Sequence, residues 1–458
     1  MARRKLGWQI VTRKRGKMRN YLLAAVGSLG LIAIAMNAAS AQALKPPAPG
    51  TIEVHLNGTL DVQLDAIGSS ANNVNGYKLN PVGIVGFLRL YPGFDGVTEN
   101  GIEYGVAAEL RDSASTISNT STGISGNSGS NSSLYIRRAY LYVGTKELGL
   151  LRAGQQDSVW WLLTTGEYYN YGDGNEWDSD GGVGNAVPNQ TIPRGLFSWA
   201  SALYTTNKLV YLSPNIDGFQ AGFGYEPNSN GFEEGINCTG GTSSCATLAS
   251  APGGAGNFRR KNTVDAAIEY TGAFRDIGYK GSVAYLLSSP IGNSDGTPIE
   301  TIVSPDTGVR VYETSFKQMG ITQISGQITY AGFLVGANVK MGQVNNGYSF
   351  LYPGQRALLF YEVTGEYNIG PITLAAQYFN DQAAGAYLPG NGVARTETDY
   401  GLDVAANYAL SRHFGVYVTY LYGHRHELGY DFITGATGSS VNNNVQAQAI
   451  SVGAKMTW

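Results

Sequence analysis

Apolar and polar residues alternate strictly over residues 51–66, where even-numbered positions are apolar or glycine and odd-numbered positions are polar or acidic. A period of two predicts a β-strand with one apolar and one polar face. Strands of soluble β-sandwiches usually have about 5–6 residues, so this segment is too long for one. It is typical of a tilted membrane strand that turns its apolar side to lipid and its polar side to a lumen.

The same alternation recurs in sixteen segments. The connections between them are alternately short, as at 145–148 and 331–332, and long, as at 113–133 and 158–206. An even strand count with this alternation predicts an all-β fold, a transmembrane antiparallel β-barrel with short periplasmic turns, long external loops and both termini periplasmic. Such a barrel must close because backbone polar groups have to be paired inside the bilayer, and about sixteen strands leave a water-filled lumen. The predicted strands are 51–67, 82–91, 101–112, 134–144, 149–157, 207–213, 219–226, 262–272, 277–287, 319–330, 333–342, 355–368, 371–381, 397–410, 414–427 and 445–458.

The composition excludes two other classes of protein. Charged residues make up 14% of the 458 residues, against about 25% in soluble proteins. Only one long apolar run exists, near the N-terminus, whereas a helical membrane protein needs several runs of about 20 apolar residues. The apolar and aromatic contents of 43% and 11% are too high for a disordered chain.

The N-terminal segment has the pattern of a secretory signal peptide. Eight basic residues and no acidic residue lie within the first twenty positions, and a mostly apolar run follows from Leu22 to Met36. Small residues come next, which predicts cleavage after Ala41, with Ala43 as the alternative site. Because the basic part is long, Met18 is an alternative start of the chain.

Cleavage changes the charge of the expected mature barrel, residues 42–458. Residues 1–41 carry eight of the 31 basic residues and none of the 34 acidic ones, so 23 basic residues remain and the formal net charge is −11. A nucleic-acid-binding protein would be basic. Nucleic acid is therefore not an expected partner.

Several segments share motifs with a known family: RLYPGFDG at 89–96, NGIEYG at 100–105, YIRRAYLYVG at 135–144 and LGLLRAGQ at 148–155. In these motifs the chain resembles the general diffusion porins of Gram-negative bacteria. The resemblance implies an integral outer-membrane channel for passive diffusion of ions and small hydrophilic solutes, with no enzymatic activity and no cofactor. It also implies a homotrimer in contact with outer-membrane lipid and lipopolysaccharide. Family members usually end in Phe, whereas this chain ends in Trp458.

The resemblance further implies that the third external loop folds inward and narrows the pore. The longest connection, 158–206, follows the fifth predicted strand and takes this place. Loops longer than about 15 residues are usually functional or disordered, and the many aromatic residues here, among them Trp160 and Trp161, favour packing. An external flap with solvated carboxylates is the alternative. The candidate constriction acids of this loop are Glu167, Asp173, Glu176, Asp178 and Asp180.

By the same resemblance, arginines on the barrel wall face these acids and create a transverse field. The alternation places Arg89 and Arg111 on the polar faces of their strands. Only one of the adjacent Arg137 and Arg138 can point inward in a regular strand, and the resemblance favours Arg137. The direction of Arg152 stays open. For each arginine, a place at the rim or in an interface is the alternative.

The polar faces of the predicted strands carry more acids than bases, which predicts a pore that prefers cations. Charges of one sign around a pore select the opposite ion, and a low-dielectric wall focuses their field. The acids counted are Glu53, Asp61, Asp65, Glu103, Glu109, Asp265, Glu269, Glu362, Glu366, Asp399 and Asp403, and the bases are Arg89, Arg111, Arg137, Lys340 and Lys455.

Two pairs of residues have candidate chemistry outside the pore. Cys238 and Cys245 lie in one Gly/Ser/Thr-rich stretch, and in an exported protein they are a candidate disulfide. His424 and His426 share a strand face near the outer rim, but paired rim histidines are more often solvated, so no metal site is expected. The aromatic residues of 158–206 could stack on sugar rings, which leaves a substrate-selective channel, for example for carbohydrates, as the alternative function.

Overall fold

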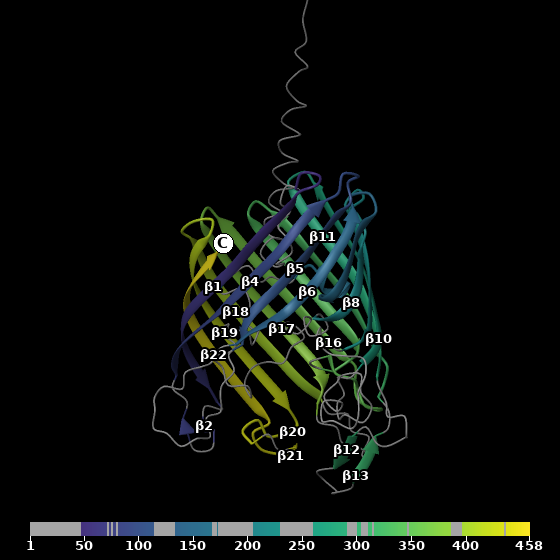
Figure 1. Cartoon of the computed structure of the whole chain (residues 1–458). Coiled ribbons are helices and arrows are strands. Elements are labelled where there is room, and N and C mark those ends of the chain that lie inside the picture. Colours follow the sequence, from purple (N-terminus) through teal and green to yellow (C-terminus); the bar gives the residue numbers. More distant parts are fainter. Residues whose placement is uncertain are drawn as a thin grey trace, which may run out of the picture. The chain divides into compact units, whose positions relative to one another are not determined.

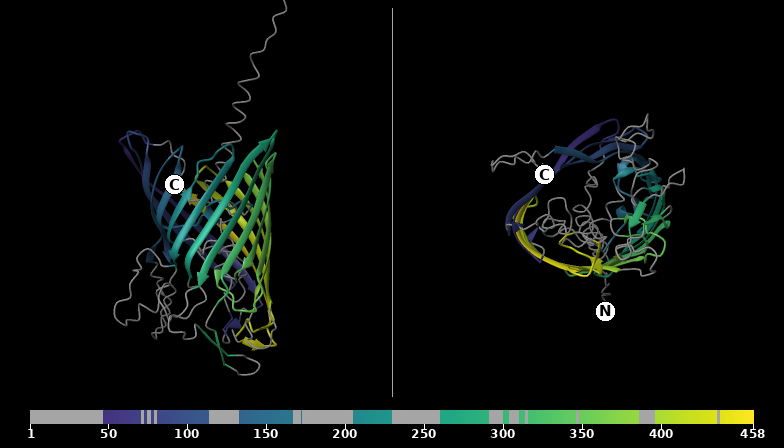
Figure 2. Two further views of the ribbon diagram at one scale, coloured as in Figure 1. Left: turned by 90° about the vertical axis from the view of Figure 1, so that its right-hand side faces the viewer. Right: turned by 90° about the horizontal axis from the view of Figure 1, so that it is seen from below.

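The computed structural model describes residues 47–70, 73–74, 77–78, 81–113, 133–166, 172, 205–229, 260–290, 300–303, 310–313, 316–345, 348–385, 396–434 and 437–458. Sixteen antiparallel strands close into one barrel, which confirms the predicted fold class. The strands tilt across the barrel in side view and form a ring in end view (Figures 1 and 2). The barrel strands are β1 (Ile52–Ser69), β4 (Val82–Val97), β5 (Glu103–Ser113), β6 (Ser133–Thr145), β7 (Gly149–Gln156), β8 (Thr206–Leu212), β9 (Phe219–Asn228), β10 (Arg260–Phe274), β11 (Ile277–Pro290), β14 (Met319–Tyr330), β15 (Phe333–Gln343), β16 (Leu358–Ile369), β17 (Ile372–Ala384), β18 (Thr396–Ala409), β19 (Phe414–Glu427) and β22 (Asn444–Thr457).

Short elements lie in the long connections. Three two-stranded ribbons were not expected from the sequence: β2 (Asn73–Val74) with β3 (Tyr77–Lys78), β12 (Glu300–Val303) with β13 (Arg310–Glu313), and β20 (Gly429–Tyr430) with β21 (Thr437–Ser439). The helix α2 (Val159–Leu162) follows β7. Within the part of the chain that the structure describes, no helix is long and apolar enough to cross a membrane.

Short turns join the strands at one end of the barrel, and the long connections lie at the other, lower in Figure 1. The turn between β14 and β15 has only two residues, Ala331 and Gly332, with φ angles of 49° and 85°. Positive φ at both positions matches the right-handed twist of a two-residue hairpin. A side chain at Gly332 would also lie 2.6 Å from the Asn368 carbonyl oxygen, so the turn needs glycine at that position.

The two faces of the barrel wall differ as the alternation predicts. In β1, Leu60, Val62 and Leu64 expose 44%, 48% and 53% of their surface on the outside, whereas Asp61 and Asp65 on the inside expose 0% and 1%. An apolar outer face suits lipid, and a polar inner face suits a lumen. The remaining barrel strands repeat this division, with apolar exceptions on the inner face that are described below.

One strand boundary differs clearly from its prediction. The sequence ends the second strand at residue 91, but β4 continues to Val97. Proline lacks a backbone N–H and is tolerated where a ladder bond is missing. The pairing of β4 with β5 skips this point, passing from Leu90 opposite Leu110 to Gly93 opposite Ala107.

Candidate channel constriction

A cluster of arginines lies on the inner face of β4–β6 around one carboxylate. Glu109 exposes only 2% of its surface. Its Oε1 is 2.5 Å from Nε of Arg111, and its Oε2 is 2.7 Å from Nη1 of Arg137 and 2.9 Å from Nε of Arg138. Arg89 stands directly opposite Arg111 in the register of the two strands. Charge-assisted contacts of this kind fix guanidinium groups in place, so Glu109 orients the cluster.

Both Arg137 and Arg138 reach the lumen, which corrects the expectation that only one of them can. The pairing of β5 with β6 shifts by one residue, from Glu109 opposite Arg138 to Leu110 opposite Ile136. A β-bulge places two residues of one strand opposite one residue of its partner and changes the direction of their side chains. Arg137 is the extra residue, so its side chain joins that of Arg138 on the inner side.

Two further contacts extend this basic wall toward β7. Nη1 of Arg138 lies 2.9 Å from Oδ2 of Asp157, just beyond the end of β7. Arg152 of β7 stands opposite Val210, whose side chain is fully buried on the inner side. The structure therefore settles the direction of Arg152, which points inward with its guanidinium 5.2 Å from the ring centre of Tyr140. We call Arg89, Arg111, Arg137, Arg138 and Arg152 the arginine cluster.

The segment after β7 enters the barrel and packs on its inner wall. Val159 and Trp160 of α2 are fully buried, and Leu163 exposes 4% of its surface. These side chains share one apolar cluster with inward residues of β8, β10 and β11. The backbone N–H of Trp160 donates to Oδ2 of Asp265 on β10 at 2.7 Å. The ring of Trp160 is buried against the wall and cannot stack on a sugar.

The same segment continues along the inner wall to β14 and β15. The side-chain amide of Gln323 donates to Oγ1 of Thr164 at 2.6 Å, and the hydroxyl of Thr165 donates to Gln327. Gly166 then lies so close to the wall that a Cβ placed on Gly336 would be 2.9 Å from the Gly166 Cα. Further along, the N–H of Gly172 donates to Oδ1 of Asn407 on β18 at 2.9 Å.

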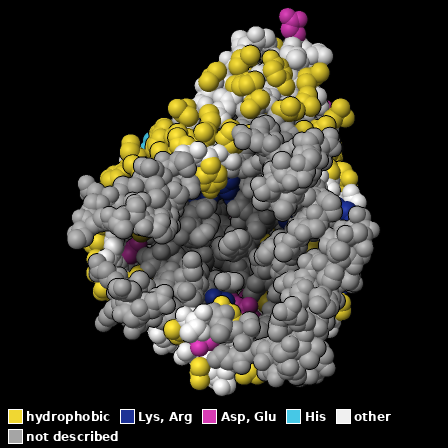
Figure 3. Space-filling view, turned by 60° about the horizontal axis from the view of Figure 1, so that its bottom comes forward, with side chains coloured by type: hydrophobic (Ala, Val, Ile, Leu, Met, Phe, Trp, Pro, Cys, Tyr) yellow, Lys and Arg dark blue, Asp and Glu magenta, His cyan; other side chains and the backbone are white. Residues whose placement is uncertain are grey.

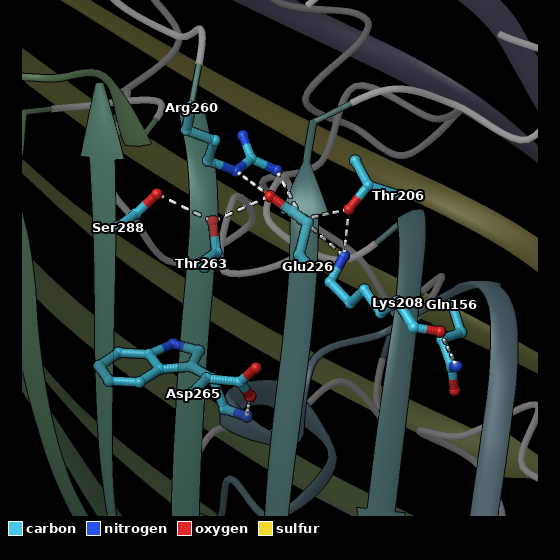
Figure 4. A network of polar contacts seen from close by, with 9 residues as sticks. Gln156, Thr206, Lys208, Glu226, Arg260, Thr263, Asp265 and Ser288 are labelled. Atoms are coloured by element: carbon cyan, nitrogen blue, oxygen red, sulfur yellow. Dashed lines mark hydrogen bonds and ion pairs between the residues drawn. The ribbon is translucent and has the colours of Figure 1, made fainter. Parts of the chain in front are cut away.

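A buried polar network supports the strands beside the start of this segment (Figure 4). Glu226 of β9 lies 2.7 Å from Nε of Arg260 and 3.1 Å from Nζ of Lys208, and the hydroxyl of Thr263 donates to it at 3.0 Å. Gln156, the last residue of β7, donates to the carbonyl oxygen of Lys208 at 3.1 Å. The network therefore links β8, β9 and β10 to the point at which the chain turns inward.

Acidic side chains occupy inward positions across the ring from the arginine cluster. In the strand order of the barrel, β16 and β17 are eight places from β6 and β7. Glu362 of β16, Asp381 of β17 and Asp403 of β18 are each fully buried on the inner side. Seen from the end with the long connections, the molecule is hollowed, and basic and acidic side chains lie at the margins of the hollow (Figure 3).

The predicted loop carboxylates and cysteines lie outside the described residues, namely Glu167, Asp173, Glu176, Asp178, Asp180, Cys238 and Cys245. The predicted wall residues Arg89, Arg111 and Arg137 are brought together around Glu109. His424 and His426 occupy outward positions of β19, where His424 stacks on Tyr400 at 4.8 Å and His426 bonds to Asn444. Among the described residues, no group of three or more His, Cys, Asp or Glu could hold a metal ion.

Sequence reasoning missed several charged residues of the inner wall. On β8 both faces are apolar around Lys208, with Val210 buried and Leu209 and Tyr211 exposed. The alternation of apolar and polar residues therefore did not show that Lys208 points inward. The additional inward bases are Arg138, Arg152, Lys208, Arg260, Lys280 and Arg425, and the additional acids are Asp95, Asp157, Glu226, Asp381, Glu397 and Glu427.

A closed sixteen-stranded barrel with an apolar outer face and a charged inner face is an outer-membrane channel. The family model described as Gram-negative porin matches residues 25–428, so the chain belongs to the Gram-negative porin family. It is thus an integral outer-membrane protein that forms a channel for diffusion, and it is not an enzyme. Among curated proteins, none matches the sequence significantly.

Solved structures share the fold at low sequence identity. The outer membrane channel DcaP of Acinetobacter baumannii has a TM-score of 0.52 at 13% identity, covering 90% of this chain and 99% of its own. The in-vitro folded outer membrane protein OmpT of Vibrio cholerae has a TM-score of 0.51 at 14% identity, covering 91% and 100%. An anion-selective porin from Comamonas acidovorans has a TM-score of 0.50 at 12% identity, covering 89% and 100%.

Proposed function

We propose that the protein is a trimeric general diffusion porin whose pore prefers cations and narrows between the arginine cluster and the acids that face it. The single observation that carries this proposal is the opposition of inward charges, with Glu362, Asp381 and Asp403 at buried inward positions across the ring from the arginines of β5–β7. A field between such charges favours polar solutes, which exchange hydration for charged partners, over apolar solutes, which gain nothing.

The inward segment supports the same constriction. Residues 157–166 pack on the inner wall, and we propose that the whole connection 158–206 is the constriction loop and that its five acids add to the acidic side. Residues 1–41 serve as the cleaved signal peptide in this proposal. Trimer formation is tested by the mass of the detergent-extracted protein, and a monomeric mass contradicts it.

Ion selectivity tests the proposal directly. In planar bilayers with a salt gradient, the reversal potential should report cation preference, which should weaken at high salt because the Debye length falls from about 10 Å at 0.1 M to about 3 Å at 1 M. Neutralising Glu167, Asp173, Glu176, Asp178 and Asp180 together should lower the preference and alter single-channel conductance. Anion preference of the parent would refute the selectivity. If the variant with all five acids neutralised had the ion selectivity and conductance of the parent, the loop acids would lie outside the constriction.

A further inference from the structure

The connection between β15 and β16, residues 344–357, is buried over residues 348–352. Within its described residues, Tyr348 and Phe350 each expose 1% of their surface and Leu351 exposes none. Connections at the external end of a barrel ordinarily extend into solvent. We call these residues the 344–357 loop.

The inner wall beneath this loop is apolar where a lumen wall is ordinarily polar. Phe360 lies at an inward-facing position of β16, two residues before the inward-facing Glu362. Phe379 lies at an inward-facing position of β17. Both are almost completely buried, and their rings lie 6.2 Å apart. Phe316, which precedes β14, packs on the loop, since its ring lies 6.2 Å from that of Phe350 and 5.0 Å from that of Tyr352. Such inward aromatic residues are stable in a water-filled barrel only if another part of the chain covers them.

Polar contacts hold the loop against the neighbouring strands. Oδ1 of Asn345 accepts the N–H of Ala384 from β17 at 3.0 Å. On the other side, the backbone N–H of Lys317 donates to the carbonyl oxygen of Leu351 at 2.8 Å, and its ammonium donates to that of Gln355 at 2.7 Å. The loop is therefore fixed on both sides, to β17 and to the residues that precede β14.

The 344–357 loop and the helix α2 are parts of the same packed unit. Val344, Tyr348 and Phe350 belong to the apolar cluster that also contains Val159 and Trp160. Two connections far apart in sequence thus share one apolar cluster with inward residues of β8, β10, β11, β14, β16, β17, β19 and β22. No described residue of β4–β7 belongs to that apolar cluster.

We propose that the 344–357 loop is a second pore-narrowing loop, which sets the size limit together with the segment after β7 and displaces the solute path toward the arginine cluster. This inference rests on the proposed porin function. Its specificity-determining residues are Tyr348, Phe350 and Tyr352, which anchor the loop on Phe360 and Phe379.

The first test replaces residues 345–356 with a four-residue Gly/Ser turn. The pairing of Gly342 with Leu358 lies outside the replaced segment, so the β15–β16 hairpin remains. Single-channel conductance should rise, and liposomes carrying the variant should admit larger sugars than the parent. Heat-dependent mobility in SDS gels verifies that the barrel is folded.

Two point variants of Phe350 in the full-length chain provide the second test, which does not depend on the shortened loop. Phe350→Asp puts a charge into the apolar cluster and should release the loop, raising conductance as the replacement does. Phe350→Leu keeps an apolar side chain and should retain the parent size limit. If the folded replacement and Phe350→Asp both keep the parent conductance and sugar cutoff, the inference is overturned while the porin function stands. A folded parent that does not conduct overturns the proposed function and the inference with it.

Discussion

The two sides of the lumen are built from different chemistry although they belong to one barrel. On β4–β7 the inward positions carry the arginine cluster, oriented by Glu109. On β10–β17 many inward positions are apolar, such as Leu286, Ile321 and Phe360, and parts of two connections pack on them. The comparison teaches that in a water-filled barrel an apolar inward residue marks the place where a loop rests.

Replacing Trp160 with alanine should have the largest effect on this comparison. Its fully buried ring anchors α2 to the apolar side, and Trp→Ala changes in packed cores cost about 3–5 kcal/mol of the free energy of unfolding. Denaturant unfolding in detergent should show this loss, and conductance should rise as the segment loosens. Trp161→Ala is the matched control, because Trp161 is only partly buried and should cost less. Equal losses of the free energy of unfolding for the two variants would contradict a specific anchoring role of Trp160.

Removing the carboxylate of Glu109 should affect the charged side next most strongly. Glu109→Gln leaves three guanidinium groups close together without their shared partner, and removing one partner of a buried ion pair costs about 3 kcal/mol. The reversal potential should also shift toward anions. Glu269→Gln is the control, because Glu269 contacts the single ammonium of Lys280 at 2.7 Å. A shift for Glu269→Gln as large as that for Glu109→Gln would show that the cluster has no special role.

A methyl group at Gly336 should have the smallest effect of the three. Its Cβ would lie 2.9 Å from the Gly166 Cα and 3.1 Å from the Gly166 carbonyl oxygen, so Gly336→Ala should push the inward segment away from β15 at a cost of about 1–3 kcal/mol. Gly365→Ala on β16 is the control, because nothing lies within 4 Å of a Cβ there. Conductance should change for the first variant and stay at the parent value for the second.

The strand pattern could be predicted from the sequence because lipid and lumen impose a strict alternation. Each of the sixteen predicted segments corresponds to one barrel strand. The extension of β4 past Pro92 could not be predicted, because it depends on a gap in the pairing with β5. Short ribbons such as β12 with β13 were missed because strands of four residues leave too little periodicity.

The candidate site was less predictable than the fold. The alternation of apolar and polar residues put Arg89 and Arg111 on the inward faces of their strands. The bulge that turns both Arg137 and Arg138 inward is a property of the pairing with β5 and not of the local sequence. The acids of 158–206 stay a prediction. Of the acids across the ring, Glu362 and Asp403 were expected on the polar faces of their strands, whereas Asp381 at the end of a predicted strand was missed.

Closure of the barrel gives the last residue of the chain a special place in biogenesis. The C-terminal strand β22 pairs with the N-terminal strand β1, and Trp458 exchanges two backbone hydrogen bonds with Gly58, both of 3.1 Å. The strand that is made first, β1, therefore gains its second neighbour in the barrel only when the strand that is made last, β22, is in place. A chain that ends one strand early would present the open edges of β1 and β19, which invite pairing with other chains. Loss of β22 would thus leave an open barrel that is prone to pair with other chains.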